Sequence, residues 1–410
     1  MAIYPKIKLR KGKEESLMRF HPWVFSGAIE SLPDNLEEGD AVSVFSHNDV
    51  FLGHGHYQIG SIAVRMLTLG EDTPLDEAFF HDRLAQAFAM RRNLGLPSAD
   101  TDAYRLVHGE GDFLPGLIVD IYGPTAVMQA HSPGMHFQRN VIANALVSQP
   151  GLGVKNVYYK SETTLPFKAE LDPCNDYILG KYSGDTATEN GLRFRIDWLK
   201  GQKTGFFIDQ RDNRSLLRSL SRDKRVLNMF CYTGGFSVYA LDGGASEVCS
   251  VDSSAKAITL TDANVALNFG DASASGRHTA VAEDAFRYLE KLPEFDPTEP
   301  AADSEPRYDI IVLDPPAFAK HRSAIRNALR GYQRLNALGI SRVAPGGIVF
   351  TFSCSQAITR EQFRLAVFSA AAQTGRRVRI LHQLTQPADH PVNIYHPEGE
   401  YLKGLVLYVE

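Results

Sequence analysis

Hydrophobic and polar positions change their period along the chain, and these changes predict where the domains lie. In residues 1–72, short apolar or alternating runs are separated by Gly, Pro, Asn and Asp, which is typical of a small β-rich domain. Within residues 73–102, the apolar positions from Phe79 to Met90 keep a helical period, and Thr73 followed by Pro74 is a favourable helix start. We therefore expect a connecting helix that begins with Thr73 as its cap.

Two larger regions follow this helix, and their patterns differ. Residues 103–197 contain short apolar runs around one helical stretch at 137–147, which predicts antiparallel strands packed on a helix, a central α+β domain. That region carries no catalytic constellation. In residues 198–410, continuous apolar runs are followed by helical stretches, the pattern of a doubly wound sheet. The predicted fold class is α/β, with a Rossmann-like C-terminal sheet preceded by the two smaller domains.

The first apolar run of the C-terminal region is followed by a glycine turn and a helical stretch. The run starts at Arg225, and the turn contains Gly234 and Gly235. Ligands of open α/β sheets bind beyond such strand ends, where a helix N-terminus also offers unpaired N–H groups. The second run ends in Asp252, roughly 20 residues beyond the turn, a position suited to a ribose diol.

The ends of the third and fourth runs decide which nucleotide-like cofactor is expected. Asp284 follows the third run and can accept a hydrogen bond from an adenine amine, and the fourth run ends in Asp314. The G-x-G-x-x-G fingerprint that favours a dinucleotide is absent. The order of the strand ends therefore favours S-adenosylmethionine (SAM) over NAD. The predicted cofactor contacts are Gln210, Asn228, Phe230, Tyr232, Gly234, Asp252, Asp284 and Asp314.

The fourth run leads into Asp314-Pro315-Pro316-Ala317-Phe318. Two prolines fix φ and remove two N–H donors, which predicts a rigid arch of carbonyl acceptors. Such an arch can hold the amino group of a flipped base, with Phe318 available for stacking. A simple strand-ending turn is the alternative, and the ordered cofactor signals before it make the substrate role the stronger interpretation.

Cys354 follows the fifth apolar run, and we expect it to face the arch at Asp314. C5 of cytosine is too weak a nucleophile to attack a methyl sulfonium unaided, and a thiolate that adds at C6 makes C5 enamine-like. The site must then favour the thiolate, because a free thiol has a pKa of about 8.5. Cys231 and Cys249 lie in or beside buried runs, and Cys174 lies in a loop with no base beside it.

Composition places the protein among ordinary soluble chains. It is 44% hydrophobic and 22% charged with a formal net charge of −5, so any RNA binding must use local cationic patches. No apolar run reaches the ~18 residues of a membrane span, and the N-terminus lacks a signal-peptide core. The four cysteines show no metal spacing and no framework of pairs. We expect a cytoplasmic protein without a metal and without membrane association.

Two local patches are the predicted RNA contacts. Near the N-terminus, cations alternate with apolar residues, so several share one strand face; the alternative is an edge strand protected by lysines. Beyond the arch, arginines spaced by four would form one stripe on a helix, and no acid occurs between Lys320 and Arg334 to pair with them. The acidic, proline-rich stretch 293–306 is predicted to be a surface loop. The RNA-contact residues are Lys6, Lys8, Arg10, Lys11, Pro315, Pro316, Phe318, Arg322, Arg326, Arg330 and Arg334.

The chain resembles the bacterial 23S ribosomal RNA large subunit methyltransferase I family. The stretches that carry the resemblance are TGFFIDQRDNR, VLNMFCYTGGFS, VLDPPAFAK, RGYQRLN, TFSCSQ, ADHPV and PEGEYLKG, together with the opening KIKLRKGKEESLMRFHPWVFSGAI, which is similar to an RNA-binding PUA domain. The resemblance implies a class I methyltransferase that uses SAM to form 5-methylcytosine in 23S rRNA, either free or in an assembling large subunit. It implies Cys354 as the nucleophile. Homodimer formation is left open.

The resemblance leaves the proton acceptor unassigned. Asp-Pro-Pro stands where RNA cytosine methyltransferases with two catalytic cysteines carry the second one, so Asp314 is only a candidate base. An RNA N-methyltransferase is the alternative function, since Asp-Pro-Pro-aromatic motifs also occur in enzymes that methylate amines or ring nitrogens without a nucleophilic cysteine. An RNA chaperone with a relic SAM site is a third interpretation, and the intact strand-end acids argue against it.

Overall fold

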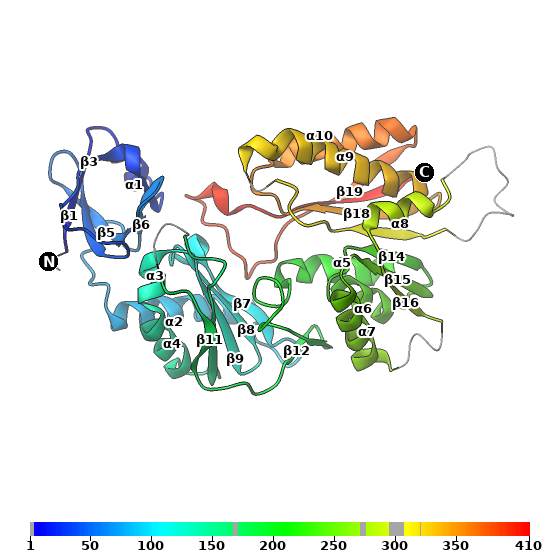
Figure 1. The fold of residues 1–410 in the computed structure, drawn as a ribbon, viewed down its shortest axis with the longest axis horizontal. Helices are drawn as coiled ribbons and strands as arrows, with labels where there is room; N and C mark the ends of the chain where they lie inside the picture. The colour runs from blue at the N-terminus through cyan, green and yellow to red at the C-terminus, as the bar shows by residue number, and fades with distance from the viewer. Residues whose placement is uncertain (1–3, 167–170, 271–275, 295–306, 320) are drawn as a thin grey trace. The chain divides into compact units, whose positions relative to one another are not determined.

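The computed structural model describes residues 4–166, 171–270, 276–294, 307–319 and 321–410 (Figure 1). By its internal contacts the chain divides into two compact units. The first unit comprises residues 1–191, 196–208 and 388–399, and the second comprises 192–195, 209–387 and 400–410. Lys320 and most of the predicted loop 293–306 lie outside the described residues. No helix in the described part of the chain is long and apolar enough to cross a membrane.

The N-terminal sheet of the first unit has six strands in the order β2-β6-β5-β4-β1-β3. β1 pairs with β4 in parallel and with β3 in antiparallel fashion, so it is an inner strand, and the edge-strand interpretation of its lysines is wrong. Its apolar residues Ile7 and Leu9 are buried, and the lysines lie on the other face. The elements are β1 (Lys6–Leu9), α1 (Glu15–Met18), β2 (Trp23–Phe25), β3 (Ile29–Ser31), β4 (Ala41–Phe45), β5 (Phe51–Tyr57) and β6 (Ile62–Met66).

The predicted connecting helix is α2 (Glu77–Asn93), and it starts later than its sequence suggests. Asp76 is the cap, because its side chain accepts a hydrogen bond from the backbone N–H of Phe79. Thr73 and Pro74 lie before the helix, where the chain buries Leu75 and its N–H donates to the hydroxyl of Tyr4. The apolar face of α2 packs into the core of the central domain, so α2 is more than a connector.

The central sheet has the order β11-β10-β9-β8-β7. It is mixed rather than antiparallel, because β9 and β10 pair in parallel. The crossover between those two strands holds two helices in place of the single helix predicted, with a break at Gln138. The elements are β7 (Ala103–His108), β8 (Leu117–Tyr122), β9 (Thr125–Ala130), α3 (Pro133–Phe137), α4 (Arg139–Ser148), β10 (Asn156–Lys160), β11 (Asn175–Leu179) and β12 (Thr186–Glu189).

The second unit contains a seven-stranded sheet in the order β16-β15-β14-β17-β18-β20-β19. The first five strands are parallel, and β20 runs antiparallel to both of its neighbours. Helices α8, α9 and α10 lie on one side of the sheet, and α5, α6 and α7 lie on the other (Figure 1). The strands are β13 (Leu192–Arg195), β14 (Arg225–Met229), β15 (Glu247–Asp252), β16 (His278–Ala282), β17 (Ile310–Leu313), β18 (Gly347–Ser353), β19 (Val378–Leu384) and β20 (Lys403–Val409). The helices are α5 (Arg211–Leu220), α6 (Gly235–Asp242), α7 (Ala255–Phe269), α8 (Ala285–Lys291), α9 (Ile325–Arg342) and α10 (Arg360–Thr374).

β19 and β20 form an antiparallel terminal hairpin, but the connection between them leaves the sheet. Residues 388–399 belong to the first unit, where the fully buried Arg91 anchors them. One guanidinium nitrogen of Arg91 donates to the carbonyl of Asp389, and the same group pairs with the carboxylate of Asp112. The buried carboxylate of Asp389 also accepts from the backbone N–H of Arg105. The ADHPV motif is therefore a structural anchor within the first unit.

Candidate active site

The carboxyl ends of β14 to β18 meet at one edge of the second unit's sheet, as the sequence predicted. The strand order reverses at β14, which has β15 on one side and β17 on the other. In open α/β sheets, such a switch point is where ligands bind. The turn at 230–234, Asp252, Asp284, the Asp314 arch and Cys354 each follow one of these strands.

The turn after β14 has an unusual backbone conformation. Phe230, Tyr232 and Gly234 have φ values of 58°, 48° and 76°, so two side-chain-bearing residues lie in the left-handed region. The carbonyl of Tyr232 accepts from Thr261 Oγ1 at 2.9 Å, and that of Thr233 accepts from Asn264 Nδ2 at 2.8 Å. Because left-handed residues persist only where surrounding contacts impose them, a turn held this firmly is a candidate ligand cradle.

Asp252 links two strand ends. Its Oδ2 accepts from the backbone N–H of Tyr232 at 3.0 Å, and its Oδ1 accepts from Ser254 at 2.9 Å. Each carboxylate oxygen has a second lone pair, so the half-buried group can still accept a ribose hydroxyl. Asp284 is exposed and caps α8 by accepting from the backbone N–H of Arg287 at 3.0 Å. Both acids are thus placed at the switch-point edge.

Two predicted cofactor contacts point elsewhere. Asn228 is 1% exposed, and its Nδ2 donates to Ser237 in α6 at 2.8 Å. Gln210 is also buried, and it accepts from Asn213 at 2.6 Å at the start of α5. Both side chains contact residues of helices in the second unit, and their role as cofactor contacts stays a prediction.

The arch after β17 places Pro315 in the interior and Pro316 at the surface, with Asp314 half-buried. The ring of Phe318 packs on Tyr332, with 4.6 Å between centroids and 33° between planes. A Cβ on Gly331 would lie 3.0 Å from the Phe318 ring, so α9 closely supports this side chain. One face of Phe318 is therefore occupied by Tyr332, which leaves less of the ring for a stacked base than predicted.

Cys354 does meet the arch. It directly follows β18, it is half-buried, and its Sγ lies 4.0 Å from the carbonyl oxygen of Pro315. The backbone around it is fixed by Tyr332, whose hydroxyl lies 2.9 Å from Ser353 Oγ and 3.0 Å from Ser355 Oγ. Burial, with a smaller contribution from Cys354, raises the pKa of Tyr332, so this hydroxyl stays protonated.

Comparisons with known proteins identify the family of this chain. A family profile described as S-adenosylmethionine-dependent methyltransferase matches residues 171–397, and a PUA-like profile matches residues 7–69. A Klebsiella pneumoniae protein named ribosomal RNA large subunit methyltransferase I is 37% identical over all of this chain and 99% of its own length. A Tolumonas auensis protein of the same name is 38% identical over 98% of each chain. The chain belongs to this methyltransferase family.

Two solved structures share the fold of this family member. A Streptococcus mutans chain, solved as a candidate SAM-dependent methyltransferase, has a TM-score of 0.81 at 24% identity. It covers 99% of this chain and the whole of its own. A second chain, solved in complex with S-adenosylhomocysteine, has a TM-score of 0.82 with the same coverage. The family profile that matches more than half of the chain is SAM-dependent, so SAM is the cofactor of this family member.

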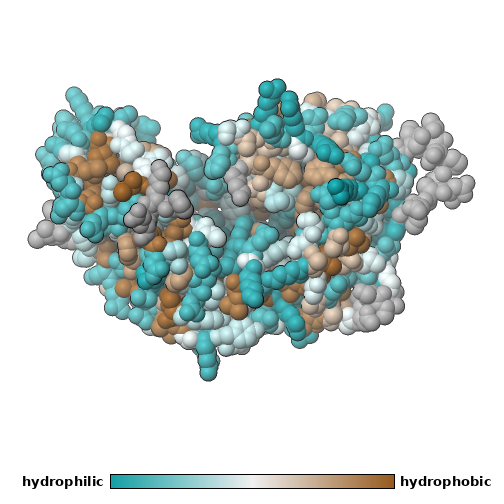
Figure 2. Space-filling model, viewed as in Figure 1, coloured by the Kyte–Doolittle hydropathy of each residue, from teal (hydrophilic) through white to brown (hydrophobic). Residues whose placement is uncertain are grey.

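The predicted cationic residues of this family member fall into two classes. Arg322, Arg326 and Arg330 are exposed and make no ion pair with any described residue. Arg334 is exposed but pairs with Glu290 at 2.6 Å. Glu290 belongs to α8, over which Figure 2 shows hydrophilic residues. The stripe of unpaired arginines is thus shorter than predicted.

The N-terminal cations are similarly divided. Lys6 and Lys8 both pair with Asp49, at 2.7 and 3.4 Å, and these lysines hold the pKa of that carboxyl below its usual range. Arg10 donates to the carbonyl of Ile29 at 2.9 Å, and Lys11 is exposed. Exposed apolar side chains lie in the same PUA-like domain, including Met18, Phe20 and Phe25, and brown hydrophobic residues interrupt its teal surface in Figure 2. Cations and exposed aromatic rings together are typical of an RNA surface.

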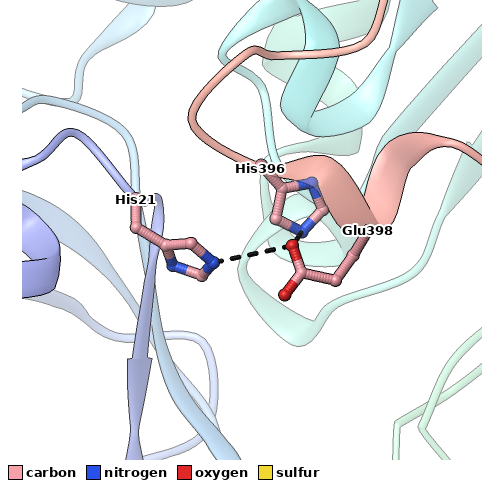
Figure 3. Close-up of side chains that lie close together, drawn as sticks. All are labelled: His21, His396 and Glu398. Carbon is pink, nitrogen blue, oxygen red and sulfur yellow. Dashed lines mark ion pairs between the residues drawn. The ribbon is translucent and has the colours of Figure 1, made fainter.

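Within the first unit, the structure brings together His21, His396 and Glu398, which no sequence spacing reveals (Figure 3). Glu398 Oε2 lies 3.7 Å from a ring nitrogen of each histidine. The backbone N–H of Trp23 donates to His21 Nδ1, so neutral His21 carries its proton on the Nε2 that faces Glu398. A metal ligand needs a lone pair on that nitrogen. We therefore interpret the group as a cluster of close polar side chains rather than as a metal site.

Sequence reasoning missed two residues beside Cys354. Tyr332 lies within RGYQRLN and Lys403 within PEGEYLKG, stretches quoted above only for their resemblance. Lys403 is a cation at the start of a continuous apolar strand, and this alone could have marked it as buried for a reason.

Proposed function

We propose that this protein transfers a methyl group from SAM to C5 of a cytosine in 23S rRNA, through a covalent adduct between Cys354 and C6. The observation that carries the proposal is the approach of Cys354 Sγ to the carbonyl of Pro315, at the strand ends where we expect SAM to bind. The full-length similarity to proteins named ribosomal RNA large subunit methyltransferase I supports an rRNA substrate.

Each step of the proposed reaction uses a group at this edge. The Cys354 thiolate adds to C6, and the electron pair released to C5 attacks the methyl carbon that SAM supplies, so that the S–CH3 bond breaks and S-adenosylhomocysteine leaves. The C5 proton then passes to a base, for which Asp314 remains a candidate, and elimination of the thiolate restores the aromatic ring. We propose that the carbonyl of Pro315 accepts a hydrogen bond from the exocyclic amine of the base.

The same edge supplies the proposed cofactor contacts. Asp252 accepts the ribose hydroxyls, Asp284 accepts the adenine amine, and the turn from Phe230 to Gly234 lies beneath the methionine portion. We propose that the exposed arginines of α9 and the cations of the PUA-like domain bind RNA phosphates. We also propose that the chain divides into four parts, with boundaries at residues 72, 102 and 197. A cytoplasmic location is part of the same proposal.

RNA that contains 5-fluorocytosine at the target tests the mechanism, because fluorine cannot leave as a proton. With SAM present, the wild type should form a protein–RNA adduct that survives denaturing electrophoresis and maps to the Cys354 peptide. Cys354→Ala should lose both the adduct and turnover while it keeps its SAM affinity. Cys174→Ala is the matched control, since Cys174 is also half-buried but lies in the first unit.

The alternative N-methyltransferase gives the opposite result. An enzyme that methylates an amine or a ring nitrogen needs no thiol, so Cys354→Ala would keep most of its turnover. Nucleoside mass spectrometry of rRNA from a deletion strain, with and without the restored gene, identifies the methylated atom. Loss of a methylated base other than 5-methylcytosine would replace the C5 mechanism with this alternative.

A further inference from the structure

Lys403 is a buried cation in the strand next to Cys354. β20 begins with Lys403, and its backbone lies opposite Ser353 in the antiparallel pair with β18. The side chain is buried, since the residue is only 5% exposed. Its Nζ donates to the carbonyl of Ser355 at 2.7 Å, so the ammonium lies at the backbone of the residue that follows Cys354.

No carboxylate pairs with this ammonium within the part of the chain that the structure describes. An ammonium has three donors, and a buried charge is costly unless an opposite charge compensates it. Two other charged groups, Arg360 and Glu400, act on Lys403 with opposite signs and pair with each other at 3.7 Å. The remaining ionisable group that acts on Lys403 is the thiol of Cys354.

We propose that Lys403 is the counter-ion of the Cys354 thiolate and holds the nucleophile ionised before substrate arrives. The inference deepens the proposed function, since it concerns the residue assigned there as nucleophile. The proton balance is simple. When Lys403 is neutral, the thiol proton passes to its amine and gives thiolate and ammonium; when Lys403 is already charged, the proton leaves to solvent, and the ammonium stabilises the anion left behind.

The electrostatics of Lys403 suit this role. Burial lowers its pKa to about 8, and interaction with Cys354 acts in the opposite direction. Below about pH 8 the side chain is therefore charged, and it favours the anionic form of a neighbouring thiol. Because the two groups titrate close together, the apparent pKa values belong to the pair. Lys403 acts through Cys354, and we classify it as a positioning residue.

The pH dependence of alkylation at Cys354 tests the inference without RNA or turnover. Full-length protein is treated with iodoacetamide over a range of pH, and modification of the Cys354 peptide is followed by mass spectrometry. In the wild type we expect the inflection at least about one unit below the ~8.5 of a free cysteine. Lys403→Met removes the charge at similar length, so the inflection should rise and the rate at pH 7 should fall about tenfold or more.

Two controls separate charge from packing. Lys403→Arg keeps the cation and should restore a low inflection, at least in part. The Cys174 peptide in the same digest should keep its own profile in every variant, because Cys174 lies in the first unit. Thermal unfolding with SAM shows whether each variant is folded. Should Lys403→Met fail to fold, the wild-type curve decides, and an inflection at or above that of a free cysteine overturns the inference.

The outcomes also separate this inference from the proposed function. If alkylation depends on Lys403 but 5-fluorocytosine traps no adduct, the ion pair of Lys403 with Cys354 is supported and the C5 mechanism is refuted. If the adduct forms and the pH profile of alkylation in Lys403→Met equals that of the wild type, the C5 mechanism is supported and the ion pair is refuted.

Discussion

The carboxylate of Asp252 accepts the backbone N–H of Tyr232, so the end of β15 holds the turn that follows β14. The same carboxylate is proposed to accept the ribose hydroxyls of SAM. Charge-assisted hydrogen bonds contribute roughly 1.5–3 kcal/mol, so Asp252→Ala should weaken SAM binding by about ten- to a hundredfold in calorimetry.

Asp284→Ala provides the comparison, because it removes a proposed adenine contact and a helix cap but leaves the Tyr232 turn untouched. Its loss of affinity should be smaller than that of Asp252→Ala. Wild-type affinity for SAM in Asp252→Ala would refute the assignment of this residue.

Gly234 is predicted to be irreplaceable in the same turn. A Cβ there would lie 2.7 Å from Thr261 Cγ2, and φ is 76°, so Gly234→Ala combines a clash with backbone strain. Left-handed strain alone costs an alanine about 1–2 kcal/mol. Gly375→Ala isolates that cost, since Gly375 has φ of 68° in open space in the same unit.

The clash can be tested separately by denaturant unfolding. Thr261→Ser deletes the clashing methyl and keeps the hydroxyl that donates to Tyr232. It should recover part of the stability lost in Gly234→Ala, and equal losses in Gly234→Ala and Gly375→Ala would show that the close approach has no energetic effect.

Arg322, which precedes α9, and the arginines of α9 should differ in their effect on RNA binding. Arg322→Gln and Arg326→Gln remove unpaired cations, so together they should reduce the slope of log affinity against log salt by about 0.7 per lost contact on a single-stranded segment. Arg334→Gln removes a cation already paired with Glu290, and its slope should change less. Equal slopes in all variants would indicate that the stripe is merely solvated.

His56 should make the first unit sensitive to acid. Burial lowers its pKa to about 4, so the folded protein keeps this ring neutral, while the unfolded chain binds a proton below about pH 6.5. The contribution of His56 therefore leaves stability unchanged above pH 6.5 and lowers it as pH falls toward 4, by up to about 1.4 kcal/mol per pH unit. Unfolding midpoints of His56→Gln should fall less over this interval than those of the wild type.

The sequence predicted the second unit better than the first, for physical reasons. Strand ends in parallel sheets meet at one edge, so the order of Asp252, Asp284, Asp314 and Cys354 along the chain was enough to bring them together. By contrast, the sequence predicted Thr73 as the cap of α2, and the structure has Asp76 there. The difference follows from the burial of Leu75, which is a tertiary contact.

Lys403 and residues 388–399 show the limit of local reasoning. The role of Lys403 depends on strand pairing between β18 and β20, which places it opposite Ser353 across about fifty residues of chain. The anchoring of Asp389 by Arg91 joins positions separated by 298 residues. Neither periodicity nor motif spacing contains such information.

The path of residues 388–399 has a consequence for the order of events during synthesis. Domains generally fold as units while the chain emerges from the ribosome, N-terminal parts first. Here the first unit lacks its Asp389 anchor and its partners for His21 until residues 388–399 have been made, which follow residues 209–387 of the second unit. The first unit is therefore completed only after most of the second unit has been made, and a chain that stops prematurely after residue 387 leaves both units unfinished.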